Sequence, residues 1–267
     1  MAELFKDKFS EVNGGQVDGS EIDNSSPLAS SSPVDGLYIS FKTVLSAQNS
    51  LKCGIDFTGL HTNHIKFLND FNIKFIACFV NSCLAHNYVP TIMLFGEIGP
   101  RLKDKFGNSN ASKNYREVMA STILFKLFEY CMVPTIKRFS KISPFQFGYR
   151  EKTSPLLGGV IFKEIVNYYI DRGNSIYTCF LDMSKAFERV IHDKLLEKLT
   201  KKGFPIAFIE TYRFIFKNSY VRVNYRGKVS DSWRACRGVR QGGISSPHFF
   251  SLYIDDILKE IHNEPMI

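Results

Sequence analysis

The clearest candidate for chemistry is an aspartate that follows a short apolar run. Residues 176–181 read Ile-Tyr-Thr-Cys-Phe-Leu, a run typical of a strand buried on both faces. Asp182 comes next, where a helical pattern begins. A carboxylate at such a turn can hold magnesium ions against nucleotide phosphates, as nucleotidyl transfer requires. The alternative is that Asp182 only caps a helix.

A second candidate is a glycine-rich turn at residues 238–247, which read Gly-Val-Arg-Gln-Gly-Gly-Ile-Ser-Ser-Pro. Paired glycines let the backbone approach a ligand closely, and Gln241 can reach a base or a phosphate. Ser246 and Pro247 are typical of the N-cap and first residue of a helix. The unpaired N–H groups of that helix would face the same ligand.

A third candidate is the basic, Gly- and Asn-rich segment 97–116, which we expect to form a loop or a hairpin. It carries Lys103, Lys105 and Arg116. A flexible cationic loop can close over a triphosphate. Many solvated surface loops have the same composition, so the segment alone does not decide between the two.

The apolar periodicity predicts mostly helices around these candidates. Residues 220–235 alternate instead, like a hairpin around Arg226-Gly227. The predicted helices are a short one capped at Thr62, then 72–86, 121–132 with Pro134 as its breaker, 156–171, one from the Asp182 turn to about 199, 205–217, and one from Ser246.

Composition limits the classes of protein. The chain has 267 residues and a net charge of +8, and residues 37–267 alone carry +13 because residues 11–36 hold five acids and no base. A basic body suggests a polyanionic partner. The six cysteines form no CxxC pair, which argues against disulfides and zinc. With neither an apolar run of 18 residues nor a signal peptide, we expect an intracellular protein without a membrane partner, in the nucleus or the cytoplasm.

The order and spacing of five elements resemble the reverse transcriptases of non-LTR retrotransposons, over about residues 40–262. The family's patterns match Pro-x-x-Lys followed by Asn-Tyr-Arg, Lys-x-x-Glu, Gln-Phe-Gly-Tyr-Arg, Leu-Asp-Met-Ser-Lys-Ala-Phe and Gly-Val-Arg-Gln-Gly. In this chain they begin at Pro100 and Asn114, Lys126, Gln146, Leu181 and Gly238. Departures from the family are Glu117 for a proline, Glu188 for an aspartate and Ser245 for a leucine.

The resemblance implies roles for individual residues. Asp182 would be a catalytic, metal-binding aspartate in a site for two Mg²⁺ ions. Phe187 would lie under the sugar and reject a 2′-hydroxyl. The other dNTP-binding residues would be Lys103, Arg116, Gln241 and Gly242. The implied partners are an RNA template, a DNA primer and dNTP.

A tempting catalytic pair is Asp255-Asp256, within Tyr-Ile-Asp-Asp. The family completes its site with a Tyr/Phe-x-Asp-Asp hairpin, but this pair follows Gln241 too closely. At 100° per residue the neighbouring apolar side chains share one helical face and the two acids fall on the other. We therefore predict that both acids are solvated, lie on a helix and are not catalytic. The alternative is a hairpin with its tip beside Asp182.

The sequence predicts an α/β right-hand polymerase fold. Residues 1–40 are expected to be a flexible acidic and Ser-rich linker, 41–155 mostly helical fingers with a basic loop, and 156–267 a partial palm. The thumb and the true aspartate pair would be missing, so we expect a truncated reverse transcriptase domain that is inactive alone. The alternatives are a non-catalytic RNA-binding remnant, and a subunit whose palm another chain completes.

Overall fold

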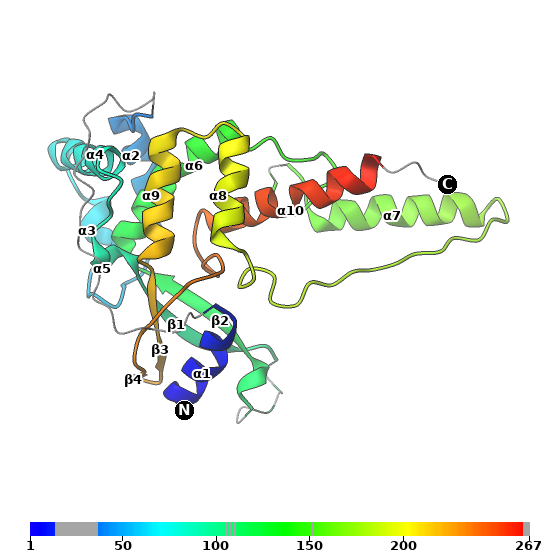
Figure 1. The fold of residues 1–267 in the computed structure, drawn as a ribbon, viewed down its shortest axis with the longest axis horizontal. Helices are drawn as coiled ribbons and strands as arrows, with labels where there is room; N and C mark the ends of the chain where they lie inside the picture. The colour runs from blue at the N-terminus through cyan, green and yellow to red at the C-terminus, as the bar shows by residue number, and fades with distance from the viewer. Residues whose placement is uncertain (14–36, 105, 107, 109–110, 151, 264–267) are drawn as a thin grey trace.

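The computed structural model describes residues 1–13, 37–104, 106, 108, 111–150 and 152–263. It is a mixed α/β fold with a helical body, a small sheet below it and a long arm to one side (Figure 1). The mixture of helices and strands agrees with the expected α/β class. The longer helices are α1 (Ala2–Asn13), α2 (Phe41–Ser50), α4 (Asp70–Ala85), α6 (Ile123–Phe139), α7 (Pro155–Ile170), α8 (His192–Lys201), α9 (Ile206–Lys217) and α10 (Ser246–Asn263). Short helical turns are α3 (Thr62–Lys66), α5 (Thr91–Leu94) and the 3-10 turn η1 (Ser112–Asn114).

The sheet combines antiparallel and parallel pairs. β1 (Phe95–Leu102) and β2 (Tyr115–Ser121) form an antiparallel hairpin, the second of the two forms expected for the basic segment. β1 also pairs in parallel with β3 (Tyr220–Tyr225), which lies far along the sequence. β3 in turn pairs with β4 (Lys228–Val229) and β5 (Trp233–Arg234). The β3–β4 turn confirms the predicted hairpin, with Arg226 and Gly227 both at positive φ.

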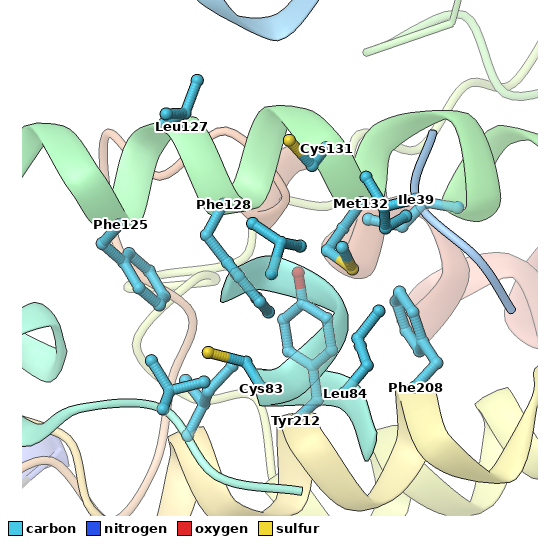
Figure 2. Close-up of a cluster of buried hydrophobic side chains, with 14 of the residues drawn as sticks. Ile39, Cys83, Leu84, Phe125, Leu127, Phe128, Cys131, Met132, Phe208 and Tyr212 are labelled. Carbon is cyan, nitrogen blue, oxygen red and sulfur yellow. The ribbon is translucent and has the colours of Figure 1, made fainter. Parts of the chain in front are cut away.

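The main hydrophobic core lies between the helices. Figure 2 shows side chains of α4, α6 and α9 meeting there, with Phe128, Leu84 and Tyr212 at the centre. Helix α6 begins after its N-cap Thr122 and continues past Pro134 to Phe139, so Pro134 does not end the helix as predicted. The apolar positions beyond Pro134 keep the helical spacing, and burial of Ile136 outweighs the lost backbone hydrogen bond.

Helix α1 differs from the linker expected over residues 1–40. Phe5 and Phe9 are 1% and 0% exposed and pack on the sheet beside Tyr115, Val223 and Trp233. Burial of the two aromatic rings stabilises the helix. The charged residues between them interrupt the apolar pattern, so the helix was not predicted from the sequence. Residues 14–36, where most of the linker was expected, lie outside the described residues.

The arm consists of α7 and the extended segment that follows it (Figure 1). Residues 176–181, expected to be a buried strand, pair with no strand in the part of the chain that the structure describes. Tyr177 and Leu181 are 97% and 88% exposed. A strand needs a neighbour to take its backbone hydrogen bonds, and composition alone does not supply one.

Helix boundaries elsewhere follow the sequence closely. The predictions for α4, α7, α9 and the start of α10 are confirmed within a few residues. The helix expected to follow the Asp182 turn starts only at His192, because residues 184–189 form turns with Lys185 at a φ of 52°.

None of the helices within the described residues is long and apolar enough to cross a membrane.

Candidate nucleotide-binding site

The β1–β2 hairpin positions two of the candidate cations. Arg101 pairs with Arg116 and Leu102 with Tyr115 in the ladder. One residue further, the Lys103 N–H donates to the Asn114 carbonyl across 2.8 Å. Lys103 and Arg116 are both exposed and lie at the loop end of the hairpin, where residues 103–114 connect its two strands. Backbone hydrogen bonds between the two strands therefore fix the positions from which both charged side chains extend.

The Phe187 segment and the glycine-rich turn are joined through their backbones. The N–H of Val239 donates to Phe187 across 2.9 Å, and that of Gly238 donates to Val190 across 2.8 Å. Gly238 has a φ of +87°, and a Cβ there would lie 2.9 Å from the Cα of Glu188. Only glycine permits this approach. The two sequence motifs thus form one structural unit.

The glycine-rich turn is also fixed to the hairpin. The N–H of Met119 in β2 donates to the Gln241 carbonyl across 2.9 Å. Gly242 has a φ of +109°, and a Cβ there would lie 2.8 Å from the Met119 carbonyl oxygen. This close approach places Gln241 and Gly242 along β2, at the edge of the sheet.

A pocket of about 620 Å³ lies where these three segments meet. The structure brings five of the six predicted site residues together around it: Lys103, Arg116, Phe187, Gln241 and Gly242. The other lining residues are Lys8, Tyr115, Glu117, Tyr149, Lys185, Ala186 and Glu188. A pocket of this volume suits a small-molecule ligand.

Two buried carboxyl groups line the pocket beside its cations. Glu117 and Glu188 are each 7% exposed. Glu188 accepts a hydrogen bond from Nε2 of Gln241 through Oε1, and its buried Oε2 has no hydrogen-bond partner. Burial, and then the charge of Glu188, raise the pKa of Glu117 to about 8. Burial also raises the pKa of Glu188. Glu117 is therefore mostly protonated at neutral pH, and the side chains that line the pocket carry a net positive charge.

Sequence reasoning missed several residues that line the pocket. Tyr149 belongs to the Gln-Phe-Gly-Tyr-Arg element, and its ring lies 5.9 Å from that of Phe187. Glu117 and Glu188 were recognised as departures from the family pattern, but only the structure shows that both line the same pocket. Lys8 carried no signal, because nothing in residues 1–13 resembles the other motifs.

A buried carboxylate supports the glycine-rich turn from behind. Glu129, the acid of the Lys-x-x-Glu element, is 2% exposed. It accepts hydrogen bonds from the backbone N–H groups of Ile244 and Ser245, across 3.1 and 3.2 Å, and from the Ser245 hydroxyl. These contacts fix the backbone just before α10 and explain why the element carries an acid.

Asp182 stands apart from the pocket. It lies at the end of the exposed segment 176–181, outside any helix or strand, and it is exposed itself. It does not line the pocket with the other five predicted residues. Within the described residues, no group of three or more His, Cys, Asp or Glu side chains could hold a metal ion. The metal-binding role of Asp182 stays a prediction.

The Asp255-Asp256 pair lies on helix α10, so the predicted helix is confirmed. The prediction that both acids are solvated is wrong for Asp255, which is 0% exposed. It accepts from the Ser143 N–H across 2.7 Å and pairs with Lys202 across 3.3 Å. Asp256 is half-exposed and pairs with Lys198 across 3.0 Å. A loop and helix α8 cover Asp255, which helical periodicity alone could not reveal.

Comparisons with known proteins agree with the motifs. Residues 103–267 match the family described as reverse transcriptase (RNA-dependent DNA polymerase). The RNA-directed DNA polymerase from mobile element jockey of Drosophila melanogaster is 26% identical over 245 residues, which are 87% of this chain and 26% of that protein. The Pol polyprotein from type-2 retrotransposable element R2DM of the same fly is 22% identical over 152 residues, which are 57% of this chain and 14% of that protein.

A third relative is the Pol polyprotein from type-1 retrotransposable element R2 of Nasonia vitripennis. It is 33% identical over 87 residues, which are 32% of this chain and 8% of that protein. The chain thus spans about a quarter or less of the length of these relatives. The matches do not favour the alternative of a non-catalytic RNA-binding remnant. The family match covers more than half of the chain, so this protein belongs to the reverse transcriptase family and carries a reverse transcriptase domain of the non-LTR retrotransposon type.

Proposed function

We propose that the pocket binds the incoming dNTP during template-directed synthesis of DNA from RNA. The observation that carries the proposal is the convergence of Lys103, Arg116, Phe187, Gln241 and Gly242 on one pocket of about 620 Å³. They come from three segments that the family pattern identifies independently. The two cations suit a triphosphate, and the aromatic ring suits a sugar.

Within this proposal each residue has one task. Lys103 and Arg116 bind phosphate oxygens, and Phe187 packs against the sugar at C2′. Gln241 and Gly242 place the nucleotide against the template, with the Gln241 amide oriented by Glu188. Reverse transcriptases generally use divalent metal ions, and two Mg²⁺ ions would neutralise phosphate charge in the complete enzyme. Asp182 is the proposed ligand from this chain. Residues 41–155 would serve as fingers and 156–267 as palm.

A second, basic groove of about 800 Å³ is the proposed path of the RNA template. Tyr149 lines both the groove and the nucleotide pocket, so the two adjoin. Polar side chains of α2, α6, the segment after α6 and the start of α10 line the groove, and side chains of these types contact nucleic-acid phosphates: Lys42, Thr43, Ser46, Ser50, Lys137, Arg150 and His248.

Nucleotide titration tests the proposal. The chain is mixed with an RNA template–DNA primer duplex whose primer ends in a dideoxynucleotide, so that binding is measured without turnover. Lys103→Ala and Arg116→Ala should each weaken binding of the complementary dNTP by roughly tenfold, the effect of one charge-assisted hydrogen bond. Arg101→Ala is the matched control, because Arg101 pairs with Arg116 in the ladder but does not line the pocket.

Equal binding of complementary and non-complementary dNTP, or equal effects of all three substitutions, would contradict the proposal. Primer extension with Mg²⁺ and an unblocked primer then tests synthesis itself. Filter retention of the RNA strand at two salt concentrations tests the groove, because phosphate contacts weaken as salt rises.

A further inference from the structure

Helix α1 is docked on the sheet beside the nucleotide pocket, although it precedes the region that matches the reverse transcriptase family. Its buried ring Phe5 contacts Tyr115 at 4.8 Å and Tyr225 at 5.1 Å between centroids. At the far side of the helix, Lys6 pairs with Asp231 across 3.5 Å. Helix α1 therefore has a defined place in the fold (Figure 1).

This docking brings the side chain of Lys8 to the pocket. Lys8 lines the pocket together with Lys103, Arg116 and Lys185. Its Nζ donates to the Ser112 carbonyl across 2.5 Å and to the Tyr115 carbonyl across 3.3 Å. An ammonium group carries three N–H donors, so these two contacts leave one for a ligand. They also hold the ammonium at the start of β2, directly before Arg116.

The charges around Lys8 favour an anionic ligand. Burial, and then the neighbouring charge of Lys103, lower the pKa of Lys8. Glu117 and Glu188 oppose this effect, but Glu117 is mostly protonated at neutral pH because its pKa is about 8. The positive charges of Lys8 and Lys103 repel each other. An anion that contacts both ammonium groups would remove the repulsion.

We propose that Lys8 binds the triphosphate of the incoming nucleotide, which makes helix α1 part of the nucleotide-binding site. This inference rests on the proposed function of the pocket. A nucleic-acid backbone carries the same phosphate chemistry, but the lysine faces a pocket of about 620 Å³, which is the size of a small-molecule site. The open groove lined by Lys42 and Arg150 suits a strand better.

The test compares three variants of the whole chain, each bound to the duplex with the dideoxy-terminated primer. Lys8→Met keeps the apolar stem and removes the charge, so dTTP affinity should fall by roughly tenfold while dTMP affinity stays unchanged. Lys8→Arg should restore most of the dTTP affinity. Lys6→Met is the matched control from the same helix, because Lys6 pairs with Asp231 and does not line the pocket, and it should leave dTTP affinity unchanged.

Each other outcome overturns the inference. If the wild-type chain binds dTTP and Lys8→Met binds it equally well, Lys8 has no role and the proposed function still stands. If Lys8→Met weakens the binding of dTTP and of dTMP equally, or weakens only the binding of the duplex, Lys8 does not contact the triphosphate. If Lys8→Met lowers the melting temperature and Lys8→Arg restores stability without affinity, Lys8 only holds the strand. If the wild-type chain does not bind dTTP, the proposed function itself fails.

Discussion

Gln241 donates a hydrogen bond from Nε2 to Oε1 of Glu188 across 2.7 Å, and both side chains line the same pocket. The bond fixes which end of the Gln241 amide faces Glu188, so the amide oxygen remains to accept from a ligand. Glu188 is thus a positioning residue. Its place next to Phe187 in the sequence couples the two predicted nucleotide-binding motifs through a side chain as well as through the backbone.

Glu188→Ala should weaken dNTP binding by roughly three- to tenfold, because Gln241 loses the acceptor that orients it. Glu188→Gln should bind nearly as well as wild type, since its amide oxygen still accepts from Gln241. Titration with dTTP measures both. Thermal unfolding serves as the control, and neither variant should be strongly destabilised, because Oε2 of Glu188 is buried without a partner. Equal affinity of all three proteins would show that Gln241 needs no orientation.

Glu117→Gln should change the pH dependence of stability. The pKa of Glu117 is about 8 in the folded chain, against an ordinary 4.5. The folded state therefore holds this proton more tightly than the unfolded state. Wild-type stability should fall as the pH rises from about 4.5 to about 8, and should then level off.

The melting-temperature difference between Glu117→Gln and wild type measures this effect. It should be close to zero near pH 4 and grow to several degrees by pH 8, at roughly 2–4 °C per kcal/mol. A difference that does not vary with pH would contradict the raised pKa.

Asp255→Asn should destabilise the chain by about 3 kcal/mol, because it removes a buried charge that Lys202 and the Ser143 N–H both contact. Asp256→Asn should change stability by less than about 1 kcal/mol, because the Asp256 side chain is half-exposed in its pair with Lys198. Urea unfolding measures both values. Equal effects would be evidence against the buried position of Asp255. The same two variants test the prediction that Asp255 and Asp256 take no part in the nucleotide site, because neither substitution should lower dNTP affinity.

Phe187→Val should let the pocket accept ribonucleotides. The ring lines the pocket and is held from behind by Phe250, at 4.8 Å between centroids. Removing the ring leaves room for one oxygen at C2′, so the ratio of dNTP to rNTP affinity should fall by roughly tenfold. Phe250→Val removes a ring from the same stack but does not line the pocket, and it should leave the ratio nearer the wild-type value. An unchanged ratio in Phe187→Val would assign Phe187 to the core alone.

Local patterns in the sequence predicted α4, α7, α9, the start of α10 and the β3–β4 hairpin, because helix caps and apolar periodicity act within a few residues. The Gly-rich turn was predictable for the same reason, since the positive φ of Gly242 is a property of one position. Features that depend on distant partners were not predictable. Asp255 lies on the expected helix, but its burial depends on Ser143 and Lys202.

The residues of the candidate site also fall into those that the sequence predicted and those whose positions depend on distant parts of the chain. The resemblance to the family placed Lys103, Phe187 and Gln241 in one site, and the fold brings them to one pocket. The run 176–181 has the composition of a strand but no neighbouring strand in the described residues, so Asp182 stays outside the pocket. Lys8 reaches the pocket only because Phe5 and Phe9 anchor α1 on the sheet.

The parallel pairing of β1 with β3 has a consequence for the order in which the protein folds. Glu97 and Arg222 form an ion pair across these strands, and 125 residues separate them in the sequence. At the usual speed of translation, β1 would leave the ribosome on the order of ten seconds before its partner strand. During that interval the β1–β2 hairpin has an open edge that can pair with other chains. Synthesis at a slower rate or without chaperones should therefore increase aggregation before the helical core can close.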